Sequence, residues 1–508
     1  MLLSAATDEL VGLYLEAIQT ALDTGRSALL LLPQTDQVET IHASVAARWG
    51  ARCEAYHAGL SPADRRRAWA RIQAGEVAVV IGTRSAVFAP LTQLGLIIVD
   101  QEDHSAYKAE NAPRYDTRII AAERARRDGA VLALASSHPS LESVHATGPN
   151  WAALVAPVRV TDWPPVTVVD LREVPSGDII SETMHQAIAV RLADRKKVLL
   201  FLNRKGYAPV LLCRDCGQAV QCPACAVGWT FHKRDGRLRC SHCGRTGKAP
   251  EVCPACTGTR LFPSGFGTEA LEEMVGMRFP HARVARLERE GTARERANAA
   301  ILSLMQAGEL DILIGTQLVV TRSPRPVASL VGLIYPDAAF HLPDFRAAER
   351  AYHTLSEVMA LADQNDADAG VVIQTYVPQH HVIRALGERN PSIFYESELA
   401  ARQALGYPPF GRLIGLRVSG TKEELVETAA SRWAALLKEE RSPDMAVLGP
   451  IPATSARVRG RTRWQLVVKG TDAAALRRAV RATLAALEKT SRAGGLRYDV
   501  DVDPQSLL

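Results

Sequence analysis

The chain has 508 residues, of which 47% are hydrophobic and 23% charged, a composition typical of a globular protein with several domains. Its net charge of +5 is small for this length and does not by itself indicate a nucleic-acid partner. No apolar run reaches the roughly 20 residues that span a bilayer, and the first residues lack the features of a signal peptide. We therefore expect a cytoplasmic protein with no membrane association.

Residues 1–155 alternate short apolar runs with helix-like stretches. The apolar runs contain no polar residue, as is typical of strands that are buried on both faces of a sheet. Alternating strands and helices predict a parallel α/β sheet. The predicted strands are 28–32, 77–81, 96–99 and 130–134, and the predicted helices include 39–49 and 65–74.

A second α/β series starts at residues 197–202 and resumes after a cysteine-rich insertion. Its later elements are helices 269–278 and 293–307 and strands 284–287, 311–314, 330–334 and 370–374. Pro408 and Pro409 then mark a break, because paired prolines continue neither a helix nor a central strand. The remainder predicts an α+β domain with strands 412–419, 464–469 and 497–502 and helices 422–439 and 472–490.

Eight of the nine cysteines form four CxxC pairs within the insertion. Two CxxC turns supply the four thiolates of a closed tetrahedral zinc site, so four pairs predict two structural zinc ions. A closed site has no open coordination position, so these ions fold the segment and do not activate water. The pairs are Cys213/Cys216, Cys222/Cys225, Cys240/Cys243 and Cys253/Cys256.

Three other uses of these cysteines fit the sequence less well. Disulfides would suit a secreted protein, but the chain shows no signal peptide. An iron–sulfur cluster also uses thiolates, although four regular pairs are not its usual pattern. A thioredoxin-like centre uses one CxxC and not four.

Several longer motifs, together with the cysteine spacing, resemble the PriA family of primosomal replication-restart helicases. They are Gly82–Pro90, Phe201–Pro209, Gly265–Glu269, Ile314–Gln317, Asp344–Arg350, Leu448–Ala453, Arg463–Gln465 and Asp501–Pro504. The resemblance implies two RecA-like helicase lobes with parallel sheets, a two-zinc module inserted in the second lobe, and a C-terminal α+β domain. The implied limits are 1–155 for the first lobe, 156–209 and 263–400 for the second, 210–262 for the zinc module and 401–508 for the C-terminal domain.

In this family the outer CxxC pairs of the zinc module share one metal and the inner pairs share the other. The resemblance therefore implies that one zinc ion is held by Cys213, Cys216, Cys253 and Cys256. The second zinc ion is then held by Cys222, Cys225, Cys240 and Cys243.

The motifs that contact the nucleotide in this family have all changed here. The phosphate loop falls on residues 4–11, which contain no glycine and have Leu10 and Val11 at the lysine and hydroxyl positions. The acidic box keeps Asp100, the Walker B acid, but has Gln101 in place of the water-positioning Glu. The coupling motif is altered at 135–139, and the arginine motif at 357–364 has lost both arginines. We therefore expect no catalytic residues, no ATP cofactor and no ATPase activity.

The resemblance then implies a nucleoid-associated binding and assembly protein. It would recognise stalled or abandoned replication forks and promote primosome assembly and reloading of the replicative helicase, without unwinding DNA. Its implied partners are forked or single-stranded DNA, primosome and helicase-loading proteins, and single-stranded DNA-binding protein. The alternatives are an active ATP-dependent 3′–5′ DNA helicase with an unusual nucleotide site, and a relic with no role on DNA.

The best remaining DNA-binding candidate is the segment 457–464. In one extended strand, alternating side chains would form a row of arginines on one face, beside an aromatic ring that stacks on a base. A charged edge strand is the alternative explanation. The candidate residues are Arg457, Arg459, Arg461, Arg463 and Trp464, and a second basic cluster in the zinc module comprises Lys233, Arg234, Arg237 and Arg239 near Trp229 and Phe231.

The start of the chain also differs from the family pattern. Active members carry a DNA-binding region, including a winged helix, ahead of the first lobe, whereas this chain begins at the phosphate-loop strand. We expect either a truncated chain or a natural start upstream of Met1.

Overall fold

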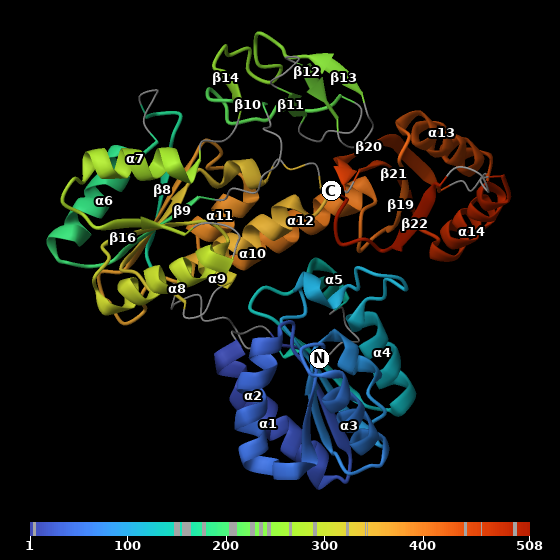
Figure 1. The fold of residues 1–508 in the computed structure, drawn as a ribbon. Helices are drawn as coiled ribbons and strands as arrows, with labels where there is room; N and C mark the ends of the chain where they lie inside the picture. The colour runs from blue at the N-terminus through green and yellow to red at the C-terminus, as the bar shows by residue number, and fades with distance from the viewer. Residues whose placement is uncertain are drawn as a thin grey trace. The chain divides into compact units, whose positions relative to one another are not determined.

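The computed structural model describes residues 1–3, 7–146, 153–154, 164–174, 179–202, 211–223, 229–232, 237–240, 245–263, 267–287, 292–321, 325–340, 342, 344–440, 444–458, 460–490 and 495–507. These residues form two compact units, Met1–Arg159 and Val160–Leu508 (Figure 1). Within those described ranges, no helix is both long and apolar enough to cross a membrane.

The first unit is a parallel α/β sheet, as the apolar runs predict. Its described strands lie in the order β3-β4-β2-β5-β6-β1-β7, and all of these pairs are parallel. The strands are β1 (Leu2–Leu3), β2 (Ser27–Leu31), β3 (Cys53–Tyr56), β4 (Val79–Gly82), β5 (Leu94–Asp100), β6 (Val131–Ala135) and β7 (Ala153–Leu154). The helices are α1 (Thr7–Asp23), α2 (Thr35–Trp49), α3 (Pro62–Gln73), α4 (Thr117–Asp128) and α5 (Leu141–Ala146).

Strand β2 shows why these runs become central strands. Leu29 and Leu31 lie in one core with Ile97, while Leu30 lies in a second core with Ile98. Helices α1 and α2 cover the face of Leu30, and α3 and α4 cover the opposite face (Figure 1). Both faces of the strand are therefore buried, and a run without polar residues satisfies both.

The second lobe, at the start of the second unit, is another parallel sheet with strands in the order β15-β16-β9-β17-β18-β8. Its strands are β8 (Val166–Asp170), β9 (Val198–Leu202), β15 (Val284–Arg286), β16 (Ile312–Gly315), β17 (Leu330–Ile334) and β18 (Gly370–Thr375). Its helices are α6 (Glu182–Ala193), α7 (Thr268–Arg278), α8 (Thr292–Ala307), α9 (Leu318–Thr321), α10 (Ala347–Met359), α11 (His381–Gly387) and α12 (Pro391–Leu405). The cysteine-rich module leaves this lobe after β9 and returns at α7, so the expected insertion is confirmed.

The described part of the module contains two small antiparallel sheets. Strands β10 (Leu211–Cys213) and β14 (Leu261–Pro263) pair where the chain enters and leaves the module, and we call this pair the neck. The other sheet contains β11 (Thr230–His232), β12 (Arg237–Arg239) and β13 (Thr246–Lys248). Its described core is small and comprises Leu211, Val220, Cys222, Trp229, Leu238 and Cys240. A core of this size needs a further source of stability, such as a metal.

The C-terminal α+β domain has an antiparallel sheet with strands in the order β20-β21-β19-β22. Its strands are β19 (Arg412–Gly420), β20 (Ala446–Val458), β21 (Arg461–Gly470) and β22 (Arg497–Val502), and its helices are α13 (Glu423–Glu439) and α14 (Ala473–Thr490). Ile414 and Leu416 face a core shared with Trp433 of α13 and Leu476 of α14. Leu413 lies in a different cluster, so the two faces of β19 contact different partners.

Candidate functional site

The carboxylate expected to bind metal in a helicase motor contacts other side chains of this chain. Asp100 ends β5 and is only 1% exposed. The hydroxyl of Tyr14, on α1, donates a hydrogen bond of 2.7 Å to Asp100 Oδ1. Gln101 Nε2 lies 3.5 Å from Asp100 Oδ2. Both carboxylate oxygens of Asp100 therefore have a neighbouring donor group from this chain.

Two tyrosines hold the end of β5. Burial and the charge of Asp100 raise the pKa of Tyr14, so its hydroxyl stays protonated and remains a hydrogen-bond donor. The hydroxyl of Tyr107 lies 2.6 Å from the carbonyl oxygen of Asp100 and 3.0 Å from that of Leu31. The backbone and the side chain of Asp100 are thus both fixed by buried phenols.

The lysine position of the phosphate loop is part of the hydrophobic core. Residues 4–6 of the expected loop lie outside the described residues, and α1 begins at Thr7. Leu10 is 3% exposed and lies in the same core cluster as Ile98 of β5. A lysine at this position would place its charge in an apolar core, where it would be costly.

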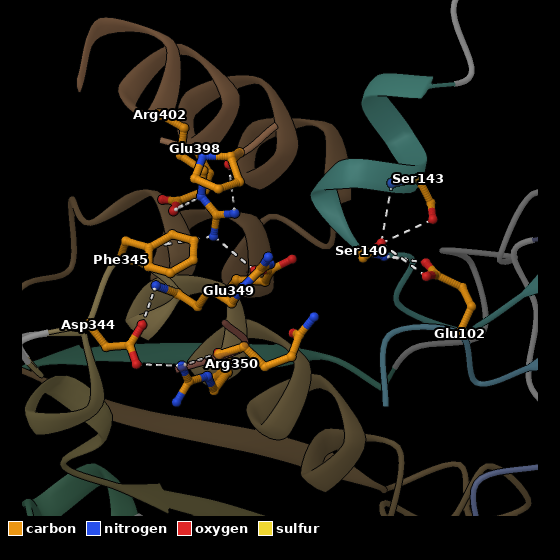
Figure 2. Close-up of polar contacts among 12 residues, drawn as sticks. Glu102, Ser140, Ser143, Asp344, Phe345, Glu349, Arg350, Glu398 and Arg402 are labelled. Atoms are coloured by element: carbon orange, nitrogen blue, oxygen red, sulfur yellow. Dashed lines mark hydrogen bonds and ion pairs between the residues drawn. The ribbon is translucent and has the colours of Figure 1, made fainter. Parts of the chain in front are cut away.

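Glu102 and Asp103, which complete the acidic box, bind the loop that follows β6. The amide and hydroxyl of Ser140 donate to Glu102 at 2.6 and 3.0 Å (Figure 2). Ser136 donates to Asp103 at 2.5 Å. Burial raises the pKa of Glu102, although Arg118, 3.2 Å away, opposes that shift. Asp103 therefore links the end of β5 to the altered coupling motif, and Glu102 links it to the residue that follows that motif.

The segment that replaces the arginine motif lies at the end of α10. Leu361, at the first arginine position, is 3% exposed and belongs to the core. Gln364, at the second, is exposed and uncharged. Residues 357–364 contain no lysine or arginine, so this segment cannot neutralise charge on a phosphate.

The outer four cysteines of the zinc module lie together. The Sγ atoms of Cys213, Cys216, Cys253 and Cys256 all lie within 4.8 Å of one another. The separation is 3.7 Å between Cys213 and Cys256 and 3.8 Å between Cys216 and Cys253. A tetrahedral zinc ion with zinc–sulfur distances of about 2.3 Å requires sulfur separations of about 3.8 Å. The geometry of these four thiols therefore fits a zinc ion.

The two outer CxxC turns share one backbone geometry. The amide of Gly217 donates to the carbonyl of Cys213, and the amide of Thr257 donates to that of Cys253, both at 2.8 Å. Gly217 and Thr257 both have positive φ, of 75° and 60°. A β-branched residue such as Thr257 rarely adopts this conformation, so the surrounding structure must hold the turn in place.

The inner four cysteines are only partly described. Cys222 and Cys240 are 1% and 2% exposed and lie beside Trp229 in the core of the module. Cys225 and Cys243 lie outside the described residues, as do Lys233 and Arg234. Arg237 and Arg239 are exposed on β12, to either side of the buried Leu238.

The arginine segment is not the single extended strand that we expected. Val458 pairs with Arg461 across a two-residue turn, and Gly460 in that turn has a φ of 76°. Position 457 pairs with Thr462, so the regular alternation expected for 457–463 is broken between β20 and β21. Arg459 lies outside the described residues. The chain reverses here because two-residue hairpin turns need positive φ, which glycine adopts at little cost.

Arg461, Arg463 and Trp464 of the arginine segment face partly inward. Arg461 is half-buried and donates to the carbonyls of Ser419 and Gly495 at 3.0 and 2.7 Å. Trp464 is half-buried and packs against the C-terminal core. Arg463 is half-buried as well. A contact with DNA at this hairpin would therefore involve partly exposed side chains.

Comparisons with known proteins agree with this arrangement of modules. Residues 403–505 match the family described as Primosomal protein N C-terminal domain, and residues 222–248 match the PriA DNA helicase Cys-rich region domain. Replication restart protein PriA of Haemophilus influenzae is 34% identical over 499 residues, which cover 97% of this chain and 68% of that protein. The Treponema pallidum protein of the same name is 33% identical over 498 residues, covering 97% of this chain and 75% of that protein. The chain belongs to the PriA family.

Some PriA family relatives are considerably longer than this chain. The Synechocystis protein is 35% identical over 511 residues, but the chain covers only 61% of it. The chain covers 62% of the Bacillus subtilis protein, at 32% identity. Among solved structures, RecG bound to a three-way DNA junction matches 80% of this chain and 46% of its own at 10% identity, with a TM-score of 0.40.

Asp337 is a further buried acid in this PriA family member, and the sequence analysis did not single it out. It follows β17 and is completely buried. Asp337 Oδ1 accepts hydrogen bonds from the hydroxyl of Thr375 and from the amides of Tyr376 and Val377, the latter two at 3.1 and 3.2 Å. Asp337 Oδ2 has no hydrogen-bond partner among the described residues. The available signal was its position shortly after a buried strand, comparable to that of Asp100 at the end of β5.

Proposed function

We propose that this chain is a replication restart factor that binds stalled or abandoned forks and promotes primosome assembly and reloading of the replicative helicase. We further propose that it does so without hydrolysing ATP. The observation that supports the second part most directly is the hydrogen bond from Tyr14 to the buried Asp100. This bond ties the acid at the Walker B position to α1 inside the fold.

The other motor positions support the same proposal. Phosphoryl transfer depends on a lysine and a metal at the phosphates and on arginines that stabilise transferred charge, and one such arginine contributes about 10³ to 10⁵ in rate. Here Leu10 and Leu361 occupy the lysine and first arginine positions, and both are core residues. Because all these groups are lost, the proposed role is to bind DNA and partner proteins and not to convert the energy of ATP hydrolysis.

We propose that the zinc module binds two zinc ions. The geometry of Cys213, Cys216, Cys253 and Cys256 supports the first site. The burial of Cys222 and Cys240 in one small core is consistent with the second, for which Cys225 and Cys243 would complete the ligands. These ions would stabilise the fold of the module, because four thiolates leave no position for substrate.

The proposed partners follow from the family and from the basic residues. Forked or single-stranded DNA would contact the arginine segment. Its phosphates would bind the arginines, and one base would stack on the aromatic ring; the residues are Arg457, Arg459, Arg461, Arg463 and Trp464. Primosome and helicase-loading proteins and single-stranded DNA-binding protein are the proposed protein partners, on the nucleoid. Replacing Arg461 and Arg463 with Ala should weaken binding to a synthetic fork and reduce the dependence of log Kd on log salt.

ATPase and unwinding assays on forked DNA test the proposal. We expect tight, salt-dependent fork binding, no DNA-stimulated hydrolysis and no strand separation. The alternative, an active 3′–5′ helicase, is favoured by the retention of Asp100. DNA-stimulated hydrolysis that disappears in Asp100→Ala would establish that alternative. If the chain does not bind forks, the remaining hypothesis is a relic with no role on DNA.

A further inference from the structure

Asp344 of the second lobe binds a segment from the end of the C-terminal domain. The hydroxyl of Ser506 donates to Asp344 Oδ2 at 2.8 Å, and the amide of Leu507 donates to the same atom at 3.2 Å. Arg350 Nη2 lies 2.6 Å from Asp344 Oδ2 (Figure 2). The same nitrogen lies 3.0 Å from the carbonyl oxygen of Gln505. One carboxylate and one guanidinium of the lobe therefore hold three consecutive residues, 505–507, which we call the strap.

An apolar contact lies beside these polar ones. Leu507 is 8% exposed and clusters with Leu413 and Val467 of the C-terminal sheet. Phe345 of the lobe packs against this cluster and stacks on Tyr407, with ring centroids 5.4 Å apart and planes 13° apart. The carbonyl of Leu507 accepts a hydrogen bond of 3.1 Å from Gln465 of β21. The strap is thus tied to the C-terminal sheet as well as to the lobe.

A buried ion network fixes the helix that leads into the C-terminal domain. Arg402, on α12, is 2% exposed and donates to Glu349 of α10 at 2.8 Å and to Glu398 at 3.1 Å (Figure 2). Arg346 donates to the same oxygen of Glu349 at 2.9 Å. The two arginines hold the pKa of Glu349 well below its usual value despite complete burial. Such a network is costly to break, because removing one member strands another charge.

These three sets of contacts all start from the segment Asp344–Arg350. Asp344 and Arg350 hold the strap, Phe345 holds Tyr407, and Glu349 holds α12. One short segment therefore contacts α12, the link after it at Tyr407, and the end of the C-terminal domain at 505–507.

We propose that the segment Asp344–Arg350 is an intramolecular docking site for the strap and makes the second lobe and the C-terminal domain one rigid body. The C-terminal domain is then fixed at both its entry and its exit. This docking arrangement is independent of the proposed function, because it concerns the relative motion of two parts of the chain and not their binding of DNA.

Replacing Asp344 with Asn tests the docking site. Hydrogen exchange measured by mass spectrometry should show the strap protected in the wild-type chain and exchanging about tenfold or more faster in Asp344→Asn, because an anionic acceptor is lost. Exchange in α13 should not change, since that helix belongs to a separate core. In calorimetry, a single transition of the second lobe and C-terminal domain should separate into two.

Two further variants keep the test decisive. Ser506 is exposed, so Ser506→Ala will fold, and it should speed strap exchange by about fivefold through the loss of one hydrogen bond. Asp499→Asn, a surface carboxylate 37% exposed and 3.9 Å from Arg417, should leave strap exchange unchanged. The proposal is wrong if the strap exchanges at the rate of an unprotected peptide in the wild-type chain, or if neither Asp344→Asn nor Ser506→Ala changes its exchange. Separate unfolding of the two domains in the wild-type chain would equally overturn it.

Discussion

Replacing Asp337 with Asn should stabilise the second lobe at neutral pH. Its three hydrogen bonds all reach Asp337 Oδ1, and an Asn side chain keeps an oxygen at that position. Asp337 Oδ2 is buried without a partner among the described residues. The change therefore removes a buried negative charge and keeps the hydrogen bonds that fix the loop, and the amide group that replaces Oδ2 costs less than the charge because it is neutral.

The size and the sign of the effect follow from the pKa. Burial raises the pKa of Asp337 from 3.8 to about 6. Between these values the folded chain holds a proton that the unfolded chain has released, so wild-type stability falls as pH rises through this window. Above pH 6 the ionised carboxylate costs about 3 kcal/mol relative to the protonated one, at about 1.36 kcal/mol per pKa unit. Asp337→Asn has no such loss.

Calorimetry between pH 4 and pH 8 measures this difference. The melting temperature of the transition that contains the second lobe should be higher in Asp337→Asn than in the wild-type chain, and the difference should grow with pH and level off above pH 6 at about 5 °C. The cysteines are common to both proteins, so their pH dependence cancels. Asp194→Asn, at an exposed position after α6, is the control and should show no pH-dependent difference. A difference between Asp337→Asn and the wild-type chain that is equal at pH 4 and pH 8 would refute the reasoning.

Three other predictions follow from the buried contacts and the thiols. Tyr14→Phe should destabilise the first unit by about 1 to 3 kcal/mol in urea unfolding, because Asp100 loses a buried donor, and calorimetric titration with ATP and magnesium should show no binding heat in either protein. Arg402→Ala should destabilise the second unit by about 3 to 5 kcal/mol in thermal unfolding, with a smaller loss for Glu398→Gln, which leaves the bond to Glu349 in place. Removing metal with a chelator should unfold the zinc module, which exposes Trp229 to solvent and makes the module accessible to trypsin. A colorimetric dye should detect about two zinc ions released per chain. Cys53→Ser should release as much zinc as the wild-type chain.

The parallel sheets could be predicted because their strands are buried on both faces. Runs such as 28–32 and 330–334 are apolar throughout because both faces of each strand are buried, and β2 and β17 lie at nearly the same residues. The predicted helix 65–74 is α3, which begins three residues earlier at Pro62, because Ser61 caps it by accepting from the amide of Asp64 at 3.1 Å and Pro62 stands at its first position. These strands and this helix are determined by residues close together in the sequence, so the sequence alone predicts them.

Strand β20 was missed because its sequence argues against a strand. Pro450 and Pro452 remove two amide donors, and Gly449 has a φ of 90°. The structure tolerates them because β20 lies at the edge of the sheet and its register shifts between Leu448 and Ile451. Edge strands and bulges are the places where a sheet accepts proline.

The buried acids and the strap could not be derived from the sequence alone. Asp337, Asp344 and Glu349 look like ordinary surface carboxylates until the elements around them are placed. Their partners lie far away in the chain, such as Thr375 for Asp337 and Ser506 for Asp344. Composition and spacing report which face of a helix is apolar, but not which distant segment covers it.

The neck of the zinc module bears on how quickly the second lobe can assemble. Strand β9 is central in its sheet, yet residues 203–267 separate it from α7 and from the strands that flank it. Pairing of Leu211 with Pro263 brings the two ends of that long insertion together. Closing the shorter loop that remains is easier by about 1 kcal/mol, because the entropy of loop closure grows with the logarithm of length. A bound metal at the base of the neck would in this way act on the folding rate of a lobe that contains none of its ligands.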